Sequence, residues 1–162
     1  MPQWVKFPLE TKEDWKEIKK RLDPHSPSRL PMNWDALARG YRDRQWIIRL
    51  YGGSLFGYLR DLMGFERILT TFYDDPGWMH EMIEYMMWFF MESNKRVLET
   101  ENIEVDICFI WEDMAFKNGP MISPKMFEEF LVPRYKKLTE FYRGYGIEFF
   151  FVDCDGDASA LI

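Results

Sequence analysis

Carboxylate side chains directly follow two apolar stretches of this sequence. Glu112 and Asp113 come after the run ICFIW, and Asp153 and Asp155 come after the run IEFFFV. Crowded carboxylates can bind a hard cation, hold a cationic or NH-rich ligand, or exchange protons when one of their pKa values is raised. We therefore take Glu112 and Asp113 as candidate catalytic residues and Asp153 and Asp155 as candidate substrate-binding residues. The alternative is that one or two of them cap helices or pair with lysine and arginine.

A third apolar stretch, WIIRLYGG, ends in two glycines that permit a tight turn and a close backbone approach. Gly53 and Ser54 stand in this turn, and Arg60 follows on a segment with helical apolar spacing. We assign all three to substrate binding, with the Arg60 guanidinium available for a substrate carboxylate. The alternative for Arg60 is a surface arginine on a helix. A phosphate-binding loop is not favoured, because no Lys-Ser or Lys-Thr follows the glycines.

Other kinds of site find little support in the sequence. Ser54 and Ser123 have no histidine placed to activate them, which argues against a hydrolase triad. Cys154 lacks a second thiol or a His-x-Cys partner nearby, so a zinc site is not supported. The alternating aspartates after IEFFFV lack the glycine and the closing glutamate of a calcium loop. We expect no bound metal and no cofactor.

Three predicted strands would position these side chains. Residues 46–53, 105–111 and 147–152 are short apolar runs rich in strand-favouring residues, and helical patterns lie between them. Alternating strands and helices predict an α/β fold with a parallel sheet. If the strands at 105–111 and 147–152 are neighbours, the four carboxylates converge at the carboxyl ends of the strands, where parallel α/β proteins carry their chemistry.

A sheet of only three parallel strands would have two open edges, which folded proteins avoid. The sequence also stops within a predicted first helical turn, ASALI. We therefore expect a portion of a (β/α)8 TIM barrel, with about three parallel strands and flanking helices. Residues 1–45 are expected to form a helical and extended segment before a barrel strand. Residues 46–162 are expected to form the central β/α units of this incomplete barrel.

The composition argues against several classes of protein. The chain has 162 residues, 47% of them hydrophobic and 18% aromatic, which suits one domain with a substantial core. A net charge of −6 and the lack of a basic cluster argue against nucleic acid as a partner. The apolar stretches are too short to cross a bilayer and the N-terminus lacks a signal-peptide pattern, so we expect no membrane partner and a cytoplasmic location. The expected partner is a small anionic substrate, and a homodimer through missing or exposed strand edges is a further option.

Three motifs resemble the uroporphyrinogen decarboxylase superfamily. The run WEDMAFKNGPMISPKMFEEFLVPRYKKL is similar to a signature in which a strand ends in an acid and a small polar residue, followed by alanine, a Ser-Pro-x-x-Phe helix start and a Phe-x-x-Pro-Tyr helix. YGGSLFGYLRDLMG resembles the glycine turn and helix after an earlier strand, and FFVDCDGD resembles a later strand that ends in Asp-Gly or His-x-Cys-Gly. The resemblance implies a (β/α)8 barrel with its pocket at the carboxyl ends of the strands.

The resemblance also implies decarboxylation of an anionic tetrapyrrole or a related acid, as in porphyrin and haem biosynthesis. Carboxylates would hold pyrrole NH groups and stabilise the cationic intermediate that protonation creates. By resemblance, Asp113 falls where decarboxylases carry a substrate-contacting serine, and Arg60 or Asp61 falls near their pocket tyrosine. The family's arginine-bearing first strand, its aspartate strand and its late histidine have no counterpart in this sequence. We therefore expect no decarboxylation by this chain alone.

Two alternatives stay open. The cobalamin-linked methyltransferases of the same superfamily use a zinc held by a His-x-Cys motif, and Asp153, Cys154 and Asp155 occupy that place here. A corrinoid-linked methyltransferase relative is therefore the second candidate, and stoichiometric zinc would favour it. The third candidate is a non-catalytic fragment or binding module.

Overall fold

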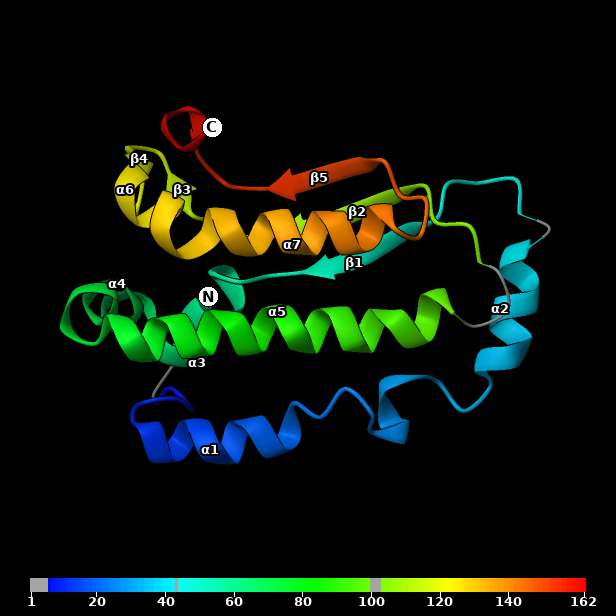
Figure 1. The fold of residues 1–162 in the computed structure, drawn as a ribbon, viewed down its shortest axis with the longest axis horizontal. Helices are drawn as coiled ribbons and strands as arrows, with labels where there is room; N and C mark the ends of the chain where they lie inside the picture. Colours follow the sequence, from blue (N-terminus) through cyan, green and yellow to red (C-terminus); the bar gives the residue numbers. More distant parts are fainter. Residues whose placement is uncertain (1–5, 43, 100–102) are drawn as a thin grey trace.

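Three parallel strands form the main sheet of the protein, in the order β1–β2–β5 (Figure 1). The computed structural model describes residues 6–42, 44–99 and 103–162. The strands are β1 (Arg49–Gly53), β2 (Ile107–Trp111) and β5 (Phe149–Asp153). β2 lies in the middle and pairs in parallel with both neighbours. The predicted parallel α/β fold is therefore confirmed, with the two strands that precede the carboxylates lying side by side.

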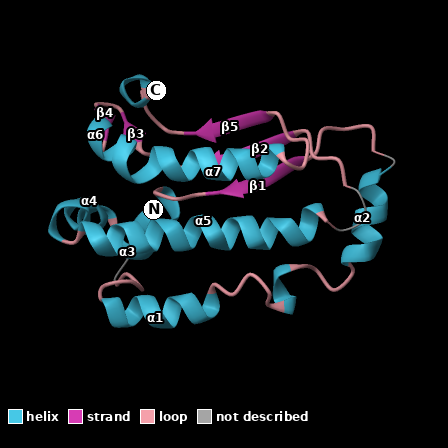
Figure 2. Cartoon of the chain, in the orientation of Figure 1, coloured by secondary structure: helices cyan, strands magenta, loops and turns pink. Residues whose placement is uncertain are grey.

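Helices connect the strands, and α5 and α7 run back in the direction opposite to the strands (Figure 2). Thr11 and Asp14 form a capping box at the start of α1. Asp75 and Ser123 each accept a backbone N–H of the helix that follows, and each is followed by a proline. The α-helices are α1 (Lys12–Arg21), α2 (Trp34–Arg42), α3 (Gly57–Met63), α4 (Phe65–Asp74), α5 (Pro76–Leu98), α6 (Pro124–Met126) and α7 (Val132–Arg143). Within the described ranges, none of them is long and apolar enough to cross a membrane.

A π turn (Phe127–Leu131) joins α6 to α7 directly before Pro133. Pro133 has no N–H to donate to a carbonyl four residues earlier, so a regular helix cannot continue through it. The Val132 N–H instead reaches the Phe127 carbonyl, five residues back. The Arg134 guanidinium lies 3.4 Å from the Glu129 carbonyl oxygen and contributes a donor there. The proline is thus accommodated by a local change of helix type.

One face of the sheet is buried against helices. Leu50, Cys108 and Ile110 lie on this face at alternate positions and belong to one hydrophobic core together with residues of α5 and α7. Burial raises the pKa of the Cys108 thiol to about 12, as expected for a packed thiol. The core therefore lies between the sheet and the two long helices.

A hydrogen-bond network joins α5 and α7 to β1. The Tyr142 hydroxyl of α7 donates to the Gly52 carbonyl at 2.7 Å. The Asn94 amide of α5 donates to the Tyr142 hydroxyl at 2.6 Å and to the Tyr51 carbonyl at 2.9 Å. Strand β1 is therefore fixed to both helices through its own backbone.

The N-terminal segment packs on α5 rather than standing apart. Figure 1 shows α1 lying alongside α5. The buried Trp15 ring meets Tyr85 edge to face at 5.4 Å, and its Nε1 donates to Glu81 at 3.2 Å. Of the predicted segment 1–45, residues 1–5 and 43 lie outside the described residues.

The other face of the sheet carries exposed aromatic side chains. Tyr51 is 42% exposed, Phe151 is 56% exposed and Phe149 is 68% exposed. Across the strands the Phe109 ring lies 6.3 Å from Tyr51 and 5.8 Å from Phe151. We call the surface formed by these residues the open face: Tyr51, Phe109, Trp111, Phe149 and Phe151. The described part of the chain forms no closed barrel, so only the parallel-sheet part of the barrel prediction is confirmed.

Candidate functional site

A pocket lies where the carboxyl ends of β2 and β5 meet α3 and a small hairpin. The hairpin consists of β3 (Ala115–Phe116) and β4 (Gly119–Pro120), which pair antiparallel. The pocket has a volume of about 410 Å³, within the size range of small-molecule sites. Its polar lining residues are Arg60, Asp113, Asn118 and Asp155, and its larger apolar ones are Phe65, Phe116 and Met121. We call it the carboxyl-end pocket.

Helix α3 places Arg60 in the wall of this pocket. The guanidinium lies 5.3 Å from the centre of the Trp111 ring. Its Nη1 donates to the Asp113 carbonyl at 3.0 Å, and its Nη2 lies 3.5 Å from Asp113 Oδ2. Only 18% of the side chain is exposed. Arg60 is therefore a positioned cation rather than a solvated surface arginine.

Asp113 has an unusual backbone and an incompletely paired carboxylate. Its φ angle is 43°, in the left-handed region that residues other than glycine rarely adopt. Its Oδ1 is buried and has no hydrogen-bond partner within the described residues. Unpartnered buried oxygens are unfavourable, and strained backbone tends to occur at functional sites. The Asp113 Oδ1 could therefore accept an N–H or O–H of a ligand in this pocket.

Asp155 reaches the pocket because the loop after β5 packs tightly on the hairpin. A Cβ atom added to Gly156 would lie 2.4 Å from the backbone N and O atoms of Phe116. Only glycine permits this approach between two backbones. On the same loop, the Cys154 thiol accepts the Ala115 N–H at 3.2 Å. These contacts hold Asp155 on the same pocket as Asp113.

The Glu112 carboxylate points away from the pocket, into the core. It is fully buried, and its two oxygens accept the backbone N–H groups of Leu55 at 2.7 Å, Phe56 at 2.7 Å and Gly57 at 2.9 Å. Burial raises the pKa of Glu112, and the three N–H donors oppose that rise. Glu112 thus attaches the end of β2 to the first turn of α3, the helix that carries Arg60.

The hydroxyl group of Tyr135 of α7 is buried beside this carboxylate. Burial raises the pKa of the Tyr135 hydroxyl well above its ordinary value, and the nearby Glu112 charge raises it further. Among the described residues, this hydroxyl has no partner that meets the usual hydrogen-bond geometry. The sequence pattern marks Tyr135 only as an apolar helix position, and no spacing signal connects it with Glu112.

Gly53, Ser54 and Asp153 support the site from outside the carboxyl-end pocket. A Cβ atom on Gly53 would lie 2.7 Å from the Phe90 ring, so this glycine serves close packing. The Ser54 hydroxyl is buried and accepts the Tyr58 N–H at 2.7 Å. The Asp153 carbonyl accepts the N–H groups of Glu112 at 3.1 Å and Asp113 at 3.3 Å.

The predicted site residues therefore fall into two groups. Arg60, Asp113 and Asp155 line one pocket, as their positions after adjacent parallel strands predict. Glu112, Asp153, Gly53 and Ser54 contribute backbone or buried contacts around it. The sequence analysis missed the pocket residues of the hairpin, above all Asn118, because Asn-Gly-Pro indicates only a turn. A polar turn directly after an acid-ended strand is the signal that would have found it.

The pocket combines one cation with carboxylates that can accept hydrogen bonds. Arginine can pair with a carboxylate through two N–H donors, and aspartate can accept N–H groups or stabilise positive charge. In the described ranges, no three His, Cys, Asp or Glu side chains come together as potential metal ligands. The arrangement thus suits a small molecule that carries both an acid and N–H donors. Comparison of the chain with models of protein families, with curated proteins and with solved structures found no match.

Proposed function

We propose that this chain supplies three neighbouring β/α units of a (β/α)8 barrel enzyme of the uroporphyrinogen decarboxylase type. Its substrate would be an anionic tetrapyrrole or a related acid, bound in the carboxyl-end pocket. The observation that carries the proposal is the meeting of Arg60, Asp113 and Asp155 around one pocket at the carboxyl ends of parallel strands. Enzymes with parallel barrels place their sites at this end of the strands.

The open face supports the barrel part of the proposal. Parallel sheets are normally covered on both faces, and in a barrel the inner face is filled by side chains from successive strands. Here Tyr51, Phe109 and Phe151 form a row across all three strands while residues on the other face pack against helices. In a closed barrel this aromatic row would become part of the interior.

The pocket supports the chemical part. Arg60 would bind one substrate carboxylate, and the unpartnered Oδ1 of Asp113 would accept a ring N–H. When a ring carbon is protonated, the ring becomes cationic, and Asp113 and Asp155 would stabilise that charge. Loss of CO2 from a side chain then returns the bonding electron pair to the ring. The exocyclic carbon takes up a proton while the ring carbon loses its own, so one proton is consumed for each CO2 released.

Binding of uroporphyrin, a stable oxidised tetrapyrrole carboxylate, tests the site in this chain. Fluorescence titration should give saturable binding, and Arg60→Ala should weaken it by about tenfold or more because a charge-assisted contact is lost. Arg143→Ala is the matched control, since Arg143 also lies over a ring of the sheet, 5.4 Å from the centre of Phe150, but does not line the pocket. Equal binding by the Arg60→Ala variant and the parent chain would refute the proposed site.

Product analysis separates the proposed reaction from the alternatives. Incubation of uroporphyrinogen with the chain extended by its flanking coding sequence should yield a product with fewer carboxyl groups. Binding without any product would favour a non-catalytic binding module. Stoichiometric zinc in the same preparation would favour the corrinoid-linked methyltransferase relative.

A further inference from the structure

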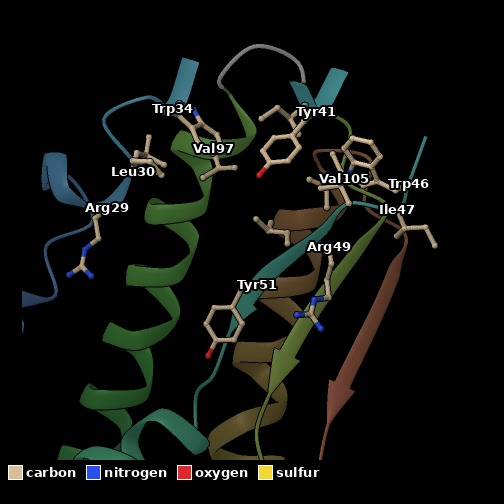
Figure 3. A pocket seen from close by; sticks show the side chains of 14 residues that line it. Arg29, Leu30, Trp34, Tyr41, Trp46, Ile47, Arg49, Tyr51, Val97 and Val105 are labelled. Carbon is tan, nitrogen blue, oxygen red and sulfur yellow. The ribbon is translucent and has the colours of Figure 1, made fainter. Parts of the chain in front are cut away.

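A second pocket lies at the opposite end of the sheet, near the amino end of β1 (Figure 3). Its volume is about 400 Å³, comparable with that of the carboxyl-end pocket and within the range of small-molecule sites. Its wall includes residues of α2, the last turn of α5, the segment before β1 and β1 itself. We call it the amino-end pocket. None of the residues predicted from the sequence to bind substrate lines it.

The upper part of this pocket is aromatic. Trp34 and Tyr41 of α2 stand 6.4 Å apart between ring centres, and Val97 of α5 lies beside Trp34 (Figure 3). Trp46 and Ile47 form the opposite side and are 60% and 66% exposed. Flat apolar walls with partly exposed rings favour a planar apolar ligand, because aromatic rings stack or meet edge to face.

The charged residues of this pocket are both arginines, in a chain whose net charge is −6. Arg29 is already engaged, since it donates to the Asp23 and Arg21 carbonyls and lies 4.8 Å from the centre of the Phe89 ring. Arg49, in contrast, is exposed at the rim. Its guanidinium lies 4.4 Å over the Phe109 ring and has no hydrogen bond or ion pair to any residue of the described part of the chain.

Two further observations indicate what would satisfy these donors. Asp106, which follows Val105 of the pocket wall, is already paired with Arg44 at 2.6 Å and with the Ile48 N–H at 2.7 Å. The Trp34 Nε1 is buried and has no partner within the described residues. The pocket lining therefore includes the Arg49 guanidinium, which is unpaired within the described residues, and no carboxylate. A bound anion would satisfy the N–H donors of the Arg49 guanidinium.

We propose that the amino-end pocket binds a planar aromatic carboxylate. The ring would lie between Trp34, Tyr41 and Val97, and the carboxylate would face Arg49 at the rim. A carboxylate matches a single free guanidinium, which can donate two parallel hydrogen bonds to it. The binding test is separate from the decarboxylase assignment, because Arg60 and the carboxyl-end pocket lie at the other end of the strands. The site is proposed for the 162-residue chain, in which Arg49 lies over Phe109 of the open face.

Titration of the chain with 2-naphthoate tests this inference. Quenching of tryptophan fluorescence should be saturable, and neutral 2-naphthamide should bind about tenfold more weakly because it cannot pair with the guanidinium. Arg49→Gln should weaken 2-naphthoate binding by a similar factor, while Arg49→Lys should retain part of the affinity. Thermal unfolding of each variant shows whether it is folded.

The controls locate the site. Arg143→Gln, which changes an arginine outside the pocket, and Arg60→Ala, which changes the carboxyl-end pocket, should both leave 2-naphthoate binding unchanged. The inference is overturned by unsaturable quenching, by equal affinity for the acid and the amide, or by unchanged binding in folded Arg49→Gln. Loss of binding in Arg60→Ala would place the ligand in the carboxyl-end pocket instead.

Discussion

Glu112 and Asp113 are adjacent in the sequence and face different surroundings. The Glu112 carboxylate is buried among three backbone N–H donors, whereas Asp113 lines a pocket beside Arg60. Both residues follow the last residue of β2, Trp111, and the left-handed φ of 43° at Asp113 turns the chain between them. The sequence predicts that acids gather at this end of the sheet. It does not show which of the two lines the pocket, because that depends on where the strand pairing stops.

Replacement of Glu112 by glutamine should destabilise the protein. Glutamine has one acceptor oxygen, and its amide group would face a backbone N–H that Glu112 now satisfies. The expected loss is about 1–3 kcal/mol in the free energy of unfolding, the usual effect of leaving a buried donor unpaired. Urea unfolding of both proteins measures it, with Glu128→Gln, on the exposed side of the π turn, as the control.

The same pair of proteins should show a defined pH dependence. Burial raises the pKa of Glu112 in the folded state above its ordinary unfolded value. The contribution of this residue is then fully present below the unfolded pKa and is lost as pH rises through the folded pKa. The difference in unfolding free energy between the parent and Glu112→Gln should therefore shrink with rising pH. A difference that grows with pH would show that the three N–H donors outweigh burial.

At the scale of elements, apolar runs predict the strands, and the capping residues Thr11, Asp75 and Ser123 mark the starts of α1, α5 and α6. Two features lie beyond this reasoning. Gly64, at a φ of 84°, separates α3 from α4 where the apolar spacing continues, and the β3–β4 hairpin places Asn118 at the pocket. Both depend on contacts with distant parts of the chain, which periodicity within a segment does not contain.

Close packing between β1 and β2 provides a test at this scale. A Cβ atom on Gly52 would lie 2.1 Å from the Cys108 sulfur, so Gly52→Ala should destabilise the protein by about 1–3 kcal/mol. Cys108→Ala removes that sulfur. The double variant should therefore be more stable than the sum of the two single changes predicts, by about 0.5 kcal/mol or more. Urea unfolding of the parent, the two single variants and the double variant gives the four free energies of unfolding from which this coupling energy is calculated.

Gly40→Ala is the matched control for this cycle. Gly40 lies in α2, and a Cβ atom there would have no neighbour within 4 Å. Alanine at a helix interior should raise stability slightly, by about 0.5–1 kcal/mol. Strict additivity of Gly52→Ala and Cys108→Ala would mean that β1 moves away from β2 at little energetic expense, contrary to the packing described above.

For the whole molecule, the open face decides between an isolated sheet and part of a barrel. The sequence predicts a parallel sheet from strand and helix alternation, but this alternation does not show what covers the row Tyr51, Phe109 and Phe151. Exposed aromatic patches of this kind mark surfaces that another part of a protein covers. Substitutions on the open face can therefore test whether this sheet closes into a barrel in a longer chain.

The substitution Phe151→Thr tests whether the open face is covered by a closed barrel. Phe151 is 56% exposed in this chain, and threonine, like phenylalanine, favours the β-strand conformation. In the 162-residue chain the change should alter the free energy of unfolding by less than about 1 kcal/mol and should reduce binding of a hydrophobic dye. In a longer chain that closes the barrel, the same change should cost about 3 kcal/mol or more, as for phenylalanine removed from a core. Tyr73→Thr, at an exposed position of α4, should have little effect in either chain. A small effect of Phe151→Thr in a folded longer chain would mean that this face stays open to solvent, and the barrel proposal would then be wrong.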